Sequence, residues 1–131
     1  MEDATFRSVY LPIVRDEEPR ALTVFDFADS SAIIGQRESS HTADQALYML
    51  NNPFVIEQSR AMADRIGRAY TNENEKVTMA FKLAYSRGPS EAERRETEKF
   101  LAKFSSASQA GAGLAALCQS LFASAEFRLV D

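Results

Sequence analysis

The sequence predicts an all-α fold, a compact helical bundle of about five helices with an extended N-terminal arm. Apolar residues recur at intervals of three and four along most of the chain, the spacing of a helix with one buried face. Residue types that cap helix N-termini precede several of these stretches. Connections between the stretches are mostly short, which favours antiparallel neighbours, and no internal repeat is visible.

The clearest helix begins near Lys76, in K-V-T-M-A-F-K-L-A-Y-S-R-G-P-S-E-A-E. Gly88 and Pro89 are expected to end it. Ser90 and Glu93 form a capping box, which begins the next helix. This segment therefore predicts a helix, a sharp corner and a second helix. The apolar face of the first helix comprises Val77, Ala80, Phe81, Ala84 and Tyr85.

The N-terminal part is less regular, and residues 1–5 are expected to be frayed. Val9, Leu11 and Ile13 alternate within residues 6–15, which favours an extended arm. Pro12 argues against a central strand. Pro19, preceded by acidic residues, predicts the opening of a helix. A short helix is favoured over a strand in A-L-T-V-F-D-F-A, because one side holds Ala21, Leu22, Phe25 and Ala28.

A polar loop is expected over residues 29–40, before a series of capped helices. Thr42 and Gln45 form the capping box of a short helix. Asn52 caps a longer helix that runs to about residue 69, with Pro53 at its first position. Asn72 opens the helix near Lys76 in the same way. The expected buried residues of the long helix are Val55, Met62, Ile66 and Ala69, and its exposed side holds Arg60, Asp64 and Arg68.

The C-terminal third holds two more amphipathic stretches. The helix after Ser90 is charged at first and apolar late, at Phe100, Leu101 and Phe104, so its second half is expected to dock. Residues 105–113, S-S-A-S-Q-A-G-A-G, are a low-complexity stretch and predict a flexible loop. The last apolar stripe comprises Leu114, Leu117, Cys118, Leu121 and Phe122.

Composition limits the classes of function. A chain of 131 residues is expected to form one domain with a substantial core. Its 15 basic and 19 acidic side chains give a net charge of −4, which argues against nucleic acid or an anionic membrane as the main partner. No apolar run is long enough to cross a bilayer, and no signal peptide is visible. Cys118, the only cysteine, excludes an internal disulfide and is expected to be buried.

Five stretches, taken in order, carry a resemblance to one family. They are R-S-V-Y-L-P-I-V-R-D (7–16), V-F-D-F-A-D-S (24–30), Q-A-L-Y-M-L-N-N-P-F-V (45–55), L-A-Y-S-R-G-P-S-E-A-E (83–93) and L-F-A-S-A-E-F (121–127). Together they resemble the C-terminal part of a planctomycete-specific domain of unknown function found in large exported proteins, often with a c-type cytochrome module upstream. The last two stretches also follow a widespread helical theme of a leucine-tyrosine helix, an arginine-proline corner and a terminal S-x-E-F.

The resemblance covers nearly the whole chain, with two departures. Asp44 stands where the family usually has proline, and Ala123 where it often has asparagine. The resemblance implies that the chain is one part of a longer, exported protein. The family has no assigned activity and no assigned catalytic residues, so none can be transferred to this chain. Any haem would lie in the upstream part, since C-x-x-C-H is absent from this chain.

No convergent catalytic set is visible, so no catalytic, cofactor-binding or metal-binding residue is predicted in this chain. His41 is the only histidine, and nothing around it resembles a nucleophile elbow. The favoured interpretation of His41 is a polar residue ahead of a helix cap. A metal site with Asp26, Asp29 or Asp44 is the open alternative.

Six residues remain as candidates for pinning the arm or for a shared cleft. Arg7, Arg15 and Arg37 could pair with carboxylates and so hold the arm on the bundle. Asp26 and Asp29 are the carboxylates best placed for this in the sequence. A cleft shared with upstream domains would instead draw on Asp26, Asp29, Arg37 and His41.

These features predict a non-catalytic structural or protein-interaction module of a larger exported protein. Its partners would be other domains of the same parent protein or another protein. An exposed patch of Tyr10, Phe25 and Phe27 is the expected contact surface. The alternative is an accessory part of an enzyme or redox assembly whose active centre lies upstream.

Overall fold

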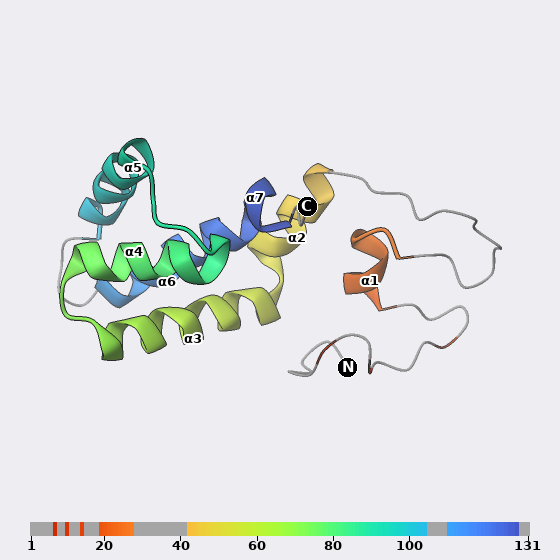
Figure 1. The fold of residues 1–131 in the computed structure, drawn as a ribbon. Coiled ribbons are helices and arrows are strands. Elements are labelled where there is room, and N and C mark those ends of the chain that lie inside the picture. Colours follow the sequence, from red (N-terminus) through yellow and green to blue (C-terminus); the bar gives the residue numbers. More distant parts are fainter. Residues whose placement is uncertain are drawn as a thin grey trace. The chain divides into compact units, whose positions relative to one another are not determined.

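The structure, a computed structural model, describes residues 7, 10, 14, 19–27, 42–104 and 110–128. These residues form helices and no strand, which confirms the predicted all-α class. The chain divides into two units, Met1–Tyr48 and Met49–Asp131, and each is described on its own. The helices are α1 (Arg20–Val24), α2 (Ala43–Asn51), α3 (Pro53–Ala69), α4 (Glu73–Tyr85), α5 (Glu91–Ala102), α6 (Ala110–Ala123) and α7 (Ala125–Arg128) (Figure 1).

In the first unit, α1 is a helical turn and a half that follows Pro19, so the short helix favoured over a strand is present, but it ends at Val24, before Phe25. The chain leaves this helix at Asp26, whose φ of 57° lies in the left-handed region. Aspartate is among the residues that adopt this region most readily. The arm predicted over residues 6–15 lies outside the described residues except at Arg7, Tyr10 and Val14. Among these, the Tyr10 N–H donates a hydrogen bond to the Arg7 carbonyl.

Three helices of the second unit, α3, α4 and α5, start where the sequence predicts. The Asn52 side chain accepts hydrogen bonds from the first backbone N–H groups of α3, and the Asn72 side chain does the same for α4. At the start of α5, the Ser90 hydroxyl accepts from the Glu93 N–H, and the Glu93 carboxylate accepts from the Ser90 N–H. These bonds satisfy donors that a helix cannot satisfy by itself.

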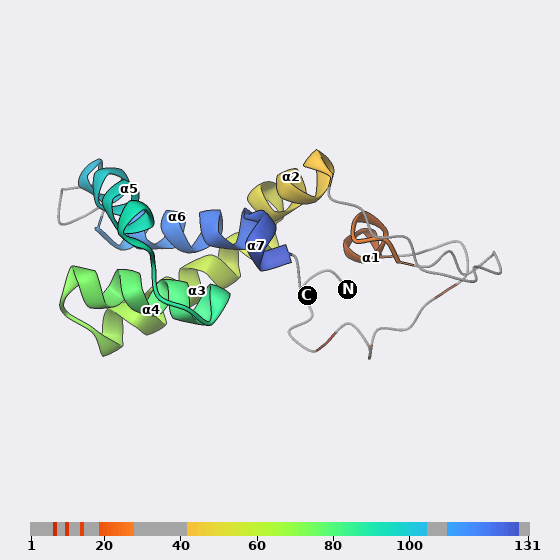
Figure 2. The same cartoon turned by 45° about the horizontal axis from the view of Figure 1, so that its top comes forward.

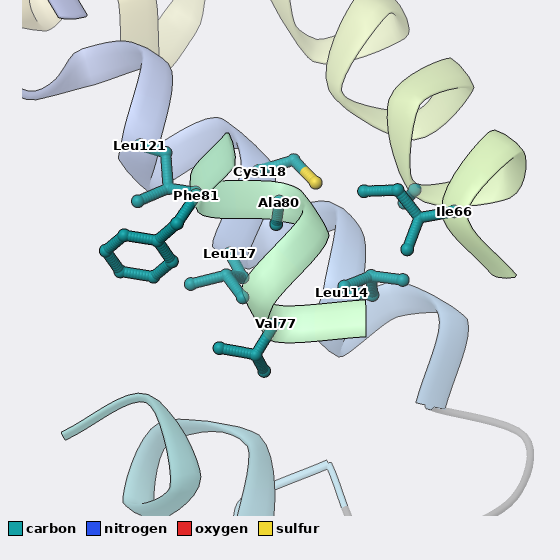
Figure 3. Close-up of a cluster of buried hydrophobic side chains, with 9 residues drawn as sticks. Ile66, Val77, Ala80, Phe81, Leu114, Leu117, Cys118 and Leu121 are labelled. Carbon is teal, nitrogen blue, oxygen red and sulfur yellow. The ribbon is translucent and has the colours of Figure 1, made fainter. Parts of the chain in front are cut away.

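The core of this unit lies where α3, α4 and α6 meet. Figure 3 shows apolar side chains from the three helices gathered at this junction. Helix α6 packs most extensively on α3, and it also contacts α4, α5 and α7 (Figures 1 and 2). Two small residues of α3, Ser59 and Ala63, are buried, and their small side chains allow α3 to lie close to its neighbouring helices. The buried core comprises Ala63, Ile66, Val77, Ala80, Phe81, Leu114, Leu117, Cys118 and Leu121.

In the second unit, the structure differs from the sequence predictions at the end of α4, at the start of α6 and at Ala69. Helix α4 ends at Tyr85, and Ser86 rather than Gly88 takes the left-handed conformation that ends it, with φ of 60°. Helix α6 begins at Ala110, so residues 110–113 of the predicted loop are helical. Gly113 in this first turn lies close to Phe104, since a Cβ on Gly113 would lie 2.9 Å from the Phe104 Cβ. Ala69, expected to be buried, is exposed at the last position of α3.

Candidate functional site

Two motifs from the sequence meet at one place, the corner between α4 and α5. The first is the Y-S-R-G-P-S-E-A-E segment that makes this corner, and the second is the S-A-E-F segment, which comprises the turn after α6 and the start of α7. We call the contact between them the corner lock. It consists of Tyr85, Arg87, Glu93, Ser124 and Glu126.

Arg87 is the centre of the corner lock. Its guanidinium donates two hydrogen bonds to the Glu126 carboxylate on α7, each 2.7 Å long. It donates two more to the Glu93 carboxylate on α5, each 2.8 Å long. A fifth goes to the Gly88 carbonyl, so every N–H group of the guanidinium has an acceptor. Paired contacts of this kind fix the direction of both carboxylates.

Ser124 is the second point of contact, at the turn between α6 and α7. Its hydroxyl oxygen accepts a hydrogen bond from the Tyr85 hydroxyl at 2.7 Å and another from the Phe127 N–H at 3.2 Å. The Ser124 hydroxyl donates in turn to the Leu121 carbonyl at 2.7 Å. One hydroxyl therefore ties α4, α6 and α7 together.

The electrostatics of the corner lock follow from these bonds. Hydrogen bonds from Arg87, and then from the Ser90 backbone N–H, lower the pKa of Glu93 to about 2. Bonds to Glu93 and Glu126 raise the pKa of Arg87 above its ordinary value. Burial is the largest cause of a raised pKa at Tyr85. At neutral pH the arginine is therefore charged, Glu93 is ionised and Tyr85 is a neutral phenol.

The chemistry available to the corner lock is that of a fixed ion pair. Acid–base catalysis needs a group whose pKa lies near the working pH, whereas the shifts here move Glu93 and Tyr85 away from neutrality. In the part of the chain that the structure describes, no three metal-binding side chains lie together. The Cys118 thiol is fully buried, and burial raises its pKa to about 12.

Of the six candidate residues, the structure describes Arg7 and Asp26. The Asp26 carboxylate accepts a hydrogen bond from the amide of Gln45, a buried residue of α2, at 3.5 Å. Arg7 is exposed. Arg15, Asp29, Arg37 and His41 lie outside the described residues. The pinning of the arm by Arg7, Arg15 and Arg37 therefore stays a prediction, as does a shared cleft of Asp26, Asp29, Arg37 and His41.

The expected aromatic contact surface is partly described. Tyr10 has 71 % of its surface exposed, whereas Phe25 and Phe27 are half-buried. The Phe25 ring meets the Tyr48 ring edge-on, with centroids 5.8 Å apart. An edge-to-face pair of this kind stabilises the packing of α1 on α2 within the first unit.

A groove that sequence reasoning missed lies between the first turn of α4 and the end of α5. Its volume is about 360 Å³. Val77, Leu101 and Phe104 give it an apolar lining, and Glu73 and Glu98 add a carboxylate from each helix. The late apolar residues of α5 indicated that this part of the helix docks, but no pattern in the sequence indicates the space left beside it.

Comparison with known proteins identifies a family. The model of the family PSD1, described as a protein of unknown function (DUF1553), matches residues 1–101. No curated protein and no solved structure matches the chain. Among the described helices, none has both the length and the apolar character needed to span a membrane.

Proposed function

Because the chain belongs to the PSD1 family of proteins of unknown function, we propose that it is a non-catalytic structural or protein-interaction module. In this proposal the chain is one part of a larger exported protein of planctomycete type. Its partners are other domains of that parent protein or another protein. The exported parent is implied by the sequence resemblance.

The observation that supports this proposal most strongly is the corner lock. Its residues come from two of the stretches that carry the family resemblance, 83–93 and 121–127, and they bind one another. Arg87 uses every guanidinium N–H on neighbouring acceptors, and the Ser124 hydroxyl both accepts and donates. A catalytic or ligand-binding role would need some of these groups to be directed at a substrate. Their mutual bonding fits a motif that serves to hold helices in place.

The test uses the intact parent protein. Arg87→Ala should lower the melting temperature of this domain and reduce the amount of partner that co-purifies with the parent, as identified by mass spectrometry. Asp64→Asn, on the exposed side of α3, is the matched control and should change neither. Full partner recovery by a parent whose domain is destabilised by Arg87→Ala would count against a module role.

The alternative function is an accessory part of an enzyme or redox assembly. The observation that favours it is Asp26, a non-glycine residue with left-handed backbone that is contacted by the buried Gln45. Residues held in sparsely populated conformations are enriched at functional sites. Asp26→Asn in the parent protein separates the two proposals. A changed activity or haem spectrum at an unchanged melting temperature supports the accessory role, and unchanged activity supports the module role.

A further inference from the structure

We propose that α7 is a salt-releasable latch, a short helix that undocks from the α4–α5 corner while the core of α3, α4 and α6 stays folded. The proposal concerns the second unit alone and does not depend on the proposed function. Three features of the contacts around Glu126 and Ser124 carry it.

The first feature is that the core is complete without α7. All nine buried residues of the cluster belong to α3, α4 and α6. Helix α7 itself has no buried residue. Regions with few buried apolar contacts open at lower free energy than the core to which they are attached. Undocking of α7 therefore leaves the main source of stability intact.

The second feature is the polar, half-exposed nature of the attachment. The bonds that join α7 and its preceding turn to the corner include the Arg87–Glu126 ion pair and the Tyr85–Ser124 hydrogen bond. The side chains of Arg87 and Glu126 remain 40 % and 46 % exposed. Ions in solution screen such a pair far more than they screen a buried one. Dissolved salt should therefore weaken the attachment without weakening the core.

The third feature is that the Arg87 guanidinium and the Tyr85 hydroxyl, the two donors that hold α7, each keep an acceptor after release. Arg87 retains its two bonds to Glu93. The Tyr85 hydroxyl lies 3.3 Å from the Leu121 carbonyl and can donate to it instead. An orphaned buried polar group would oppose release, and neither of these groups is left in that condition.

An apolar contact between α6 and α7 opposes release and provides the means to detect it. The rings of Phe122 on α6 and Phe127 on α7 lie 4.9 Å apart between centroids. The chain contains no tryptophan. A Phe127→Trp variant therefore carries a single indole whose fluorescence reports on the docking of α7. Cys118 in the core reports separately on the opening of α6, because its thiol is fully buried.

The experiment compares this reporter with the core as salt is raised to about 1 M, where the screening length falls to about 3 Å. Acrylamide quenching of the indole and its emission maximum are measured beside far-UV circular dichroism and Cys118 labelling. Adding Glu126→Gln to the reporter variant should raise quenching severalfold even at low salt. Glu73→Gln removes a different ion pair, the one with Lys76 on α4, and should leave quenching unchanged.

The latch predicts increased quenching and a red shift in high salt with the helical signal and Cys118 protection unchanged. The proposal is overturned if the indole becomes accessible only when the helical signal is lost. Hydrogen exchange of the Phe127 amide in the unmodified chain gives a second measurement, because this N–H is bonded to the Ser124 hydroxyl. Exchange of this amide should be accelerated by salt, and exchange at the rate of the core amides in high salt would contradict the latch.

Discussion

Gly113 on α6 is a residue whose missing side chain shapes the packing of its neighbours. A Cβ at this position would lie 2.9 Å from the Phe104 Cβ and 3.0 Å from the Phe104 Cγ. Its φ is not positive, so backbone strain is not the reason for glycine here. The close approach of the ring after α5 is the reason.

The prediction for Gly113→Ala is a loss of stability. Alanine favours a helix by up to about 1 kcal/mol over glycine, but forcing a methyl group into a close-packed contact typically costs about 1–3 kcal/mol. Gly67→Ala is the control, because a Cβ there meets nothing within 4 Å. It should stabilise the chain. Urea denaturation of both variants checks this, and two changes of the same sign would contradict the packing argument.

Cys118 provides a second prediction at this scale. The thiol is fully buried, and burial raises its pKa to about 12. The thiolate is the reactive form, so a native-state thiol at pH 8 should resist Ellman's reagent until the chain unfolds. The raised pKa also means that the unfolded chain ionises first, so the thiol favours unfolding as the pH rises above about 9. Rapid stoichiometric labelling in native buffer would show that α6 is less buried than the structure indicates.

Individual helices were predictable to the extent that their signals are local. The N-caps of α3, α4 and α5 are Asn52, Asn72 and Ser90. Each accepts its capping hydrogen bonds from N–H groups no more than three residues further on, so a short stretch of sequence contains the whole interaction. The left-handed Ser86 was not predictable, because serine carries no strong preference for that conformation. The helical start of α6 was not predictable either, since its alternating alanine and glycine residues are typical of loops.

At the scale of α5, Glu93 predicts an acid dependence of stability. Its folded pKa is about 2, lowered from 4.5, so its contribution is present above about pH 4.5 and is lost as the pH falls toward 2. Glu93→Gln should therefore flatten the decline in unfolding free energy over this range. Exposure of the site to water and salt limits the size of the effect.

The control for Glu93→Gln is Glu91→Gln. Glu91 lies in the same first turn of α5 but outside the Arg87 contacts. It has the same favourable position at the positive end of the helix dipole, which isolates the effect of the arginine. Urea titrations between pH 2 and 6 compare the two variants with the unmodified chain. Equal acid dependence in all three would contradict the assignment of the low pKa to the corner lock.

In the molecule as a whole, α6 supplies four of the nine core residues although it lies beyond the stretch that the family model matches. The sequence indicated its buried stripe, and the structure confirms Leu114, Leu117, Cys118 and Leu121 as buried. The sequence did not indicate which helices this stripe would meet. Pairs such as Arg87 and Glu126 are 39 residues apart, and only the packed helices decide that they meet.

Deletion variants test whether the core of the second unit requires α6 but not α7. A chain ending at Ala102 lacks α6 and should lose cooperative unfolding, because Ile66, Val77 and Phe81 would face water. A chain ending at Ser124 lacks only α7 and should still unfold cooperatively, at a somewhat lower temperature. Thermal melts followed by far-UV circular dichroism distinguish the two. A cooperative transition in the shorter chain would show that α6 is not part of the core.

The central claim is that the corner motif and the S-x-E-F motif hold each other in place. The most direct measurement is a double-mutant cycle of Tyr85→Phe and Ser124→Ala, followed by urea denaturation at low salt, where α7 is docked. The bond between the two hydroxyl groups predicts a coupling of about 0.5–1.5 kcal/mol, with the double variant losing less than the sum of the single losses. Losses that simply add would mean that the two motifs do not stabilise each other, and the account of the corner lock would be wrong.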